Sequence, residues 1–133
     1  KLKKKLVINP AELKQDMIFN FFEQAGAEWA ARKEVIYKVS AAAQETVEII
    51  INQKITLSYI DMTAEFEEYG IDILIAYTGG LINISAEKPT DIDFLNETEW
   101  RRKMSSLLIT KYANNIKLKQ NDKKSIILLH FEH

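Results

Sequence analysis

The segment 28–52 places the strongest constraint on the fold, because it combines helical periodicity with an alanine-rich centre. Its apolar residues recur every three or four positions and share one stripe, formed by Val35, Ile36, Val39, Ala43, Val47 and Ile50. A helix that is apolar along one face must bury that face against another layer of structure. The sequence therefore predicts a long helix that packs on a second layer.

Several other segments are typical of strands. Residues 6–8 form a short apolar run, and residues 54–60 alternate polar and apolar side chains, as in a strand with one solvated face. Residues 71–77 are almost continuously apolar, which favours a central strand that ends at Thr78-Gly79-Gly80. Residues 81–84 are expected to resume pairing, and the runs at 116–119 and 125–131 predict a hairpin around a turn at 120–124.

Two more helices and a long crossover complete the pattern. Asn9 and Pro10 favour the start of a helix, and Gly26 favours its end. Residues 85–96 are polar and predict an irregular crossover. A third helix over 97–114 is expected to bury Trp100, Met104, Leu107, Leu108 and Tyr112. The order predicts an α+β two-layer sandwich, in which a mixed, largely antiparallel sheet is covered on one face by three helices.

The composition fits a single domain over residues 1–133 and excludes several classes of function. The chain contains no cysteine, which excludes disulfides, cysteine-ligated zinc and cysteine nucleophiles, and fits a reducing compartment such as the cytoplasm. Its net charge of -1 gives no basic field for nucleic acid, and its apolar runs are too short to cross a bilayer. The basic start, Lys1-Leu2-Lys3-Lys4-Lys5, predicts a domain excised from a larger protein.

The element order resembles the histidine-kinase-like ATPase fold of the GHKL family over nearly the whole chain. The stretch from Met104 to Leu118 looks like the last helix and strand of the compact anti-sigma-factor kinases, whose dimers imply a homodimer here. A shorter stretch, Gly26 to Ile36, resembles ATPase-like domains at the cytoplasmic C-termini of some xanthine/uracil permeases. That second resemblance implies a domain at the cytoplasmic face of the inner membrane, with the transporter body as its partner.

The family resemblance implies a nucleotide site, whose first motif is a Glu and an Asn four residues apart on the long helix. In the family the Asn binds Mg²⁺ and the Glu orients water. Glu48 and Asn52 have this spacing, and one helical turn puts them on the same face. Moving the register by one turn selects Gln44 and Glu48 instead, a pair that would activate water poorly.

The second family motif is Asp-x-Gly-x-Gly after the central strand, where the Asp binds the adenine amino group. The corresponding stretch is Tyr77-Thr78-Gly79-Gly80-Leu81, and alignment on either glycine puts Tyr77 or Ala76 where the Asp is required. The third motif is a glycine-rich lid around the phosphates, and residues 85–108 contain no glycine. The motifs therefore predict a degenerate nucleotide site.

We accordingly expect a non-catalytic regulatory or interaction domain without a cofactor, rather than an enzyme. Two alternatives stay open. One is an ATP-binding kinase or ATPase of the anti-sigma-factor type, which would use ATP and Mg²⁺, and the other is a nucleobase-sensing domain that stacks its ligand on an aromatic ring. The candidate binding residues are Glu48, Asn52, Tyr77, Thr78, Gly79 and Gly80.

The remaining polar residues give weaker signals. His130 and His133 are expected on one face of the last strand, but no third metal ligand is tied to them by spacing. No serine has the Gly-x-Ser-x-Gly surroundings of a hydrolase. The acidic residues between 65 and 72 and the basic run 101–103 are expected on solvated surfaces. Trp29 and Trp100 are expected in the core.

Overall fold

The computed structural model describes residues 2–56 and 58–133 of the chain. Its elements follow in the order β1 (Leu2–Ile8), the 3₁₀ turn η1 (Pro10–Glu12), α1 (Met17–Trp29), α2 (Lys33–Asn52), β2 (Ile60–Phe66), β3 (Gly70–Thr78), the 3₁₀ turn η2 (Asp93–Leu95), α3 (Glu97–Tyr112), β4 (Asn115–Asn121) and β5 (Lys124–Glu132). The chain thus forms the α+β sandwich that the sequence predicts.

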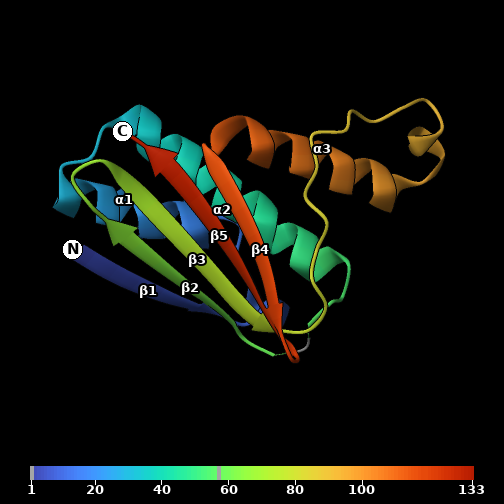
Figure 1. Ribbon diagram of the computed structural model, residues 1–133, viewed down its shortest axis with the longest axis horizontal. Helices are drawn as coiled ribbons and strands as arrows, with labels where there is room; N and C mark the ends of the chain where they lie inside the picture. Colours follow the sequence, from blue (N-terminus) through green and yellow to red (C-terminus); the bar gives the residue numbers. More distant parts are fainter. Residues whose placement is uncertain (1, 57) are drawn as a thin grey trace.

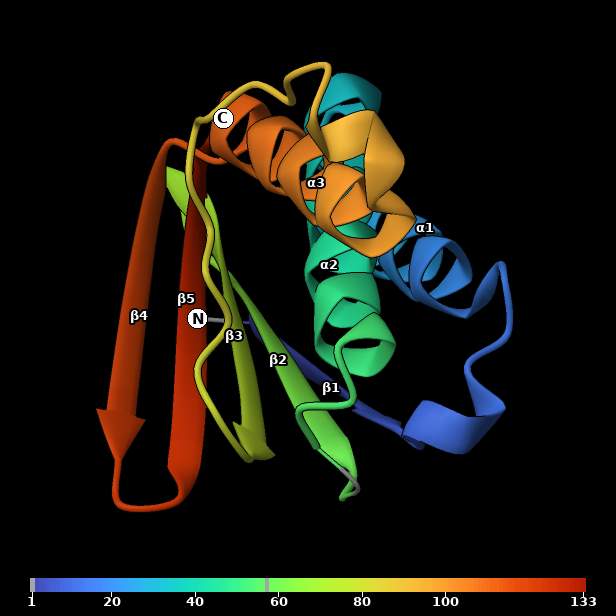
Figure 2. The same ribbon diagram turned by 90° about the vertical axis from the view of Figure 1, so that its right-hand side faces the viewer.

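The strands form one sheet in the order β1-β2-β3-β5-β4 (Figure 1). All four pairings in this sheet are antiparallel. The helices lie on one face of the sheet, which is clearest in Figure 2, and the other face is left open. No helix within residues 2–56 and 58–133 is both long enough and apolar enough to cross a membrane.

The core fills the space between the sheet and the helices. Strand residues alternate in direction, so that Ile71, Ile73, Ile75 and Tyr77 of β3 all turn toward the helices. The central helix α2 packs against both α1 and α3, and it buries most of the stripe that its periodicity predicts. The long helix is therefore the element around which the helical layer is built.

The predicted strand over 54–60 is wrong, because the residues after α2 close the helix instead. Lys54 has a φ of 52°, and the amides of Lys54 and Ile55 donate to the carbonyls of Ile51 and Ile50. This Schellman arrangement satisfies the free carbonyls at the helix end. The following strand β2 begins only at Ile60. Leu57, within the predicted strand, lies outside the described residues.

The first helix is also shorter and later than predicted. The cap at Asn9, whose side chain accepts from the Ala11 amide, starts only the 3₁₀ turn η1. The helix α1 begins at Met17 and continues through Gly26, where we expected it to end. A Cβ atom at Gly26 would lie 2.7 Å from Ile36 Cγ1. The glycine thus permits close packing of α1 on α2.

Two predictions for the region after β3 are wrong as well. Residues 81–84 form no strand, and the chain instead runs along the molecule to η2 before α3 returns (Figure 1). The fully buried residues of α3 are Ser106 and Ile109. Of the predicted buried face, Met104 is exposed and the other members are only partly buried, namely Trp100, Leu107, Leu108 and Tyr112.

Candidate functional site

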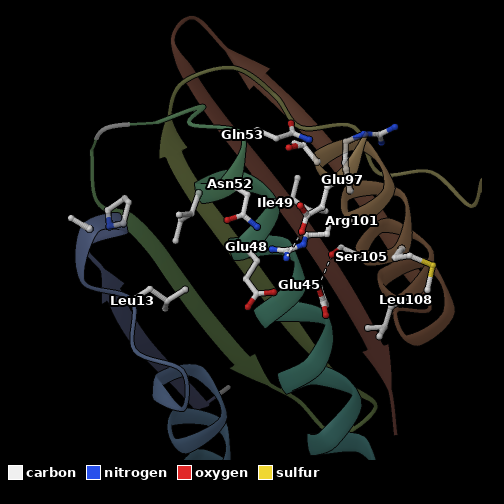
Figure 3. Close-up of a pocket in the computed structure, with 16 residues that line it drawn as sticks. Leu13, Glu45, Glu48, Ile49, Asn52, Gln53, Glu97, Arg101, Ser105 and Leu108 are labelled. Atoms are coloured by element: carbon white, nitrogen blue, oxygen red, sulfur yellow. Dashed lines mark hydrogen bonds and ion pairs between the residues drawn. The ribbon is translucent and has the colours of Figure 1, made fainter. Parts of the chain in front are cut away.

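A groove of about 870 Å³ opens between residues 10–13, the second half of α2 and the first three turns of α3 (Figure 3). One set of lining residues is apolar and comprises Pro10, Ala11, Leu13, Ile49, Ile51, Met104 and Leu108. The other set is polar and comprises Glu45, Glu48, Asn52, Gln53, Glu97, Thr98, Arg101, Arg102 and Ser105. The groove thus combines an apolar wall with a larger set of polar and charged groups that could orient a ligand.

The structure brings two of the predicted site residues together in this groove. Glu48 and Asn52 both line it, one helical turn apart, and Asn52 is the last residue of α2. Gln44, the partner of Glu48 in the alternative register, donates from Nε2 to Glu48 Oε1 at 2.9 Å. In the alternative register Gln44 and Glu48 would face a nucleotide together, whereas here the Gln44 amide is bound to the Glu48 carboxylate.

Glu45 is a groove residue that the sequence reasoning missed. Its Oε2 accepts a hydrogen bond of 2.7 Å from Ser105 Oγ, which links α2 to α3. Burial raises the pKa of Glu45 above its usual range, the negative charge of Glu48 adds to this, and the Ser105 hydrogen bond opposes it. The spacing of Glu45, Glu48 and Asn52 at i, i+3 and i+7 on one helix could have identified this group.

The α3 wall carries guanidinium groups that are already paired. Arg101 Nη2 lies 2.9 Å from Glu97 Oε1, and Arg102 binds Glu99 through both Nε and Nη2. The latter hydrogen bonds raise the pKa of Arg102 and lower that of Glu99. The prediction of a solvated basic run is thus wrong for Arg102 and Lys103, whose side chains are only 11% and 16% exposed.

The net charge of the groove lining is negative. Three carboxylates, those of Glu45, Glu48 and Glu97, share the lining with two guanidinium groups, and one of these is held by Glu99. Arg101 is in turn paired with Glu97. Glu45 and Glu48 therefore face the groove without an arginine partner among the hydrogen bonds of the described residues, and the groove favours a cation over a phosphate.

The other four predicted site residues lie at the end of β3, and none of them lines the groove. Tyr77 is only 2% exposed, and its hydroxyl donates to the Gly80 carbonyl at 2.8 Å. Burial raises the pKa of this tyrosine. The exposed Thr78 completes β3 beside it. The aromatic side chain is therefore part of the core and bound to its own turn.

Gly79 is enclosed by residues distant in sequence. Its amide donates to the Lys123 carbonyl at 2.8 Å, and its carbonyl accepts from Ser125 Oγ at 2.7 Å. With a φ of 151°, it also lies so close to the segment after α2 that an added Cβ atom would meet the Ile55 carbonyl oxygen at 2.3 Å. The turn after β3 is thus closed by the β4–β5 hairpin and by Ile55.

The prediction that His130 and His133 share one face of the last strand is wrong, because they are three residues apart and β5 ends at Glu132, before His133. His130 Nδ1 lies 2.6 Å from Asp72 Oδ1, whereas the ring of His133 stacks on Phe66 with centroids 5.2 Å apart. Trp29 also stacks on the ring of Phe66, and it is buried as predicted. No cluster of three or more metal-ligating side chains lies within the described part of the chain.

Comparison with known proteins identifies no family for this chain. No protein-family model matches the chain, and no curated protein matches it in sequence. The resemblance to the ATPase fold therefore stays a prediction from the sequence.

Proposed function

We propose that this chain is a non-catalytic regulatory or interaction domain with a degenerate nucleotide site. The observation that carries the proposal is the closed turn after β3. Where the resemblance requires an aspartate that binds adenine, Tyr77 is buried and its hydroxyl is bound to Gly80. As part of the same proposal, the domain is cytoplasmic and works on the body of a transporter, as the permease resemblance implies.

The charge of the groove supports the loss of nucleotide chemistry. A triphosphate would enter a lining with three carboxylates, and Arg101 and Arg102 are already held by Glu97 and Glu99. A phosphate in a partly buried site requires free cationic groups or amide donors to offset its desolvation. Binding in the groove would therefore not compensate a Mg²⁺–ATP complex for the hydration that its phosphates lose.

An ATP-binding domain of the anti-sigma-factor type is the second candidate, and one observation favours it. Glu48 and Asn52 have the family spacing and both face the same groove. In that function Asn52 would bind Mg²⁺ and Glu48 would orient water. The nucleobase sensor has no comparable support, because the ring of Tyr77 is buried in the core.

A thermal-shift titration with Mg²⁺–ATP, Mg²⁺–ADP, xanthine and uracil tests the proposal. A ligand present at a hundred times its Kd stabilises a protein by about 2.7 kcal/mol, which is a shift of several degrees. We expect no shift with any of the four compounds. A saturable rise with Mg²⁺–ATP that disappears in the Asn52→Ala variant would contradict the proposal and support the second candidate.

A further inference from the structure

The segment between β3 and α3 ends in a projecting tip that exposes three large apolar side chains. Ile92, Phe94 and Leu95 are 77%, 68% and 89% exposed. Figure 1 shows η2, to which two of them belong, at the far end of α3 and beyond the edge of the sheet. Neighbouring large apolar side chains that are exposed together are typical of an interaction surface.

The tip is anchored by polar contacts beneath it. Asp93, between the exposed residues, is buried, and its Oδ2 accepts from the Thr90 amide at 2.7 Å and from Lys103 Nζ at 3.1 Å. These contacts, led by the Thr90 amide, lower the pKa of Asp93. The Phe94 ring also lies 5.5 Å from the Trp100 ring. An anchored tip loses little conformational entropy when a partner binds.

An apolar strip on α3 continues the tip toward the groove. Trp100, Met104 and Leu108 follow one another at four-residue spacing, so they share a face of the helix over about 12 Å. Met104 and Leu108 also line the groove. We call this surface the α3 track, and its members are Ile92, Phe94, Leu95, Trp100, Met104 and Leu108.

The exposed charge beside the α3 track is mainly acidic. The side chain of Glu97 is 79% exposed, and Glu45 and Glu48 lie in the adjoining groove. In the Arg102–Glu99 and Lys103–Asp93 pairs, the basic side chain is largely covered. Arg101 is exposed but paired with Glu97. A partner on this surface would therefore meet apolar side chains flanked by carboxylates.

We propose that the α3 track binds a basic amphipathic helix of a partner protein. The apolar face of that helix lies on the track, and its Lys or Arg side chains pair with the carboxylates of Glu45 and Glu48 in the adjoining groove, because Arg101 already holds Glu97. This inference rests on the proposed function, since it names the partner chemistry of an interaction domain. The same carboxylates oppose docking on an anionic membrane and packing of the track against a second copy of itself.

The test is a titration with a synthetic amphipathic helical peptide of leucine and lysine, about 14 residues long so that it can form several turns. The peptide lacks tryptophan, so the emission of Trp100 reports contact with the track, while Trp29 is buried elsewhere. We expect saturable binding by the wild-type chain. The double variant Ile92→Ser/Leu95→Ser should weaken it by about tenfold or more.

Two controls make the result specific. The Tyr69→Ser variant removes an equally exposed side chain, 77% exposed, from the β2–β3 turn, and it should bind as the wild type does. A peptide with glutamate in place of lysine should not bind. Circular dichroism of both variants checks that they fold, which their exposed positions lead us to expect.

Several outcomes would overturn the inference. These are no binding of the lysine peptide, equal loss in the Tyr69→Ser variant, or equal binding of the glutamate peptide. A concentration-dependent dimer in sedimentation that Ile92→Ser/Leu95→Ser abolishes would instead assign the track to a second copy. Binding to anionic vesicles that this variant abolishes would assign it to a membrane. Nucleotide binding in the thermal-shift titration would contradict the proposed function without affecting these results.

Discussion

The two halves of the predicted nucleotide site differ in whether other elements cover them. Glu48 and Asn52 on α2 face an open groove, whereas Tyr77 and Gly79 at the end of β3 are enclosed. The α2 surface is only bordered by η1 and α3, so it stays accessible. The end of the central strand is packed by the β4–β5 hairpin and by the segment that closes α2. Candidate residues on a helix surface thus stay accessible, whereas those at the end of a core strand are covered by the elements that pack around it.

The largest expected effect is that of Gly79→Ala, which tests how tightly the turn is closed. The added methyl group would meet the Ile55 carbonyl oxygen at a backbone φ of 151° that side chains rarely adopt. We expect the free energy of unfolding in urea to fall by about 2–4 kcal/mol. The matched variant Gly80→Ala, whose methyl group would lie 3.7 Å from Ile55 Cγ2, should stay within about 0.5 kcal/mol of the wild type. Equal losses in the two variants would show that the turn is not closed by Ile55.

The hydroxyl of Tyr77 is expected to make a smaller contribution to the same turn. Tyr77→Phe removes its hydrogen bond to the Gly80 carbonyl and should cost about 1 kcal/mol of unfolding free energy in urea. Tyr69→Phe, at an exposed position, is the control and should change nothing measurable. An unchanged stability in Tyr77→Phe would mean that the buried ring alone holds the turn.

Glu45, which lies in the groove beside Glu48, is expected to make the free energy of unfolding depend on pH. Burial raises the pKa of Glu45, so the folded chain holds this proton more tightly than the unfolded chain does. Stability is therefore lost as the pH rises from the ordinary carboxyl range through the raised pKa. Glu45→Gln stays neutral and keeps an acceptor for Ser105, so it should lose less stability than the wild type over this window.

Urea unfolding of both proteins at a series of pH values measures this difference. The lowered pKa values of Asp93 and Glu99 act in the opposite sense, since their contribution is lost as the pH falls, and they are the same in both proteins. Identical pH profiles for Glu45→Gln and the wild type would contradict the burial of this carboxyl group.

The sequence predicted those parts of the fold that depend on local periodicity. The apolar stripe of α2 and the terminal hairpin both form as expected, because the helical hydrogen bonds of α2 and the pairing of β4 with β5 join residues close in sequence. The alternation at 54–60 was misleading, since closure of α2 by Lys54 and Ile55 outweighed strand pairing. The stripe of α3 shows a further limit: Trp100 and Met104 have helical spacing, but spacing does not say whether another layer covers them.

The same distinction applies to the candidate site. The spacing of Glu48 and Asn52 predicted a shared helix face, and both line the groove. The closure of the β3 turn could not be predicted in this way, because Ser125, which binds Gly79, is 46 residues away in the chain. Contacts of this kind arise from the sheet topology and leave no local pattern in the sequence.

The most direct test of a degenerate site is amide chemical-shift mapping of the labelled chain with millimolar Mg²⁺–ATP. We predict no saturable shift of the Gly79 and Gly80 amides, since the turn is closed by Lys123, Ser125 and Ile55. Saturable shifts of these two amides together with those of Glu48 and Asn52 would contradict it, because they would show one nucleotide bridging both halves of the site.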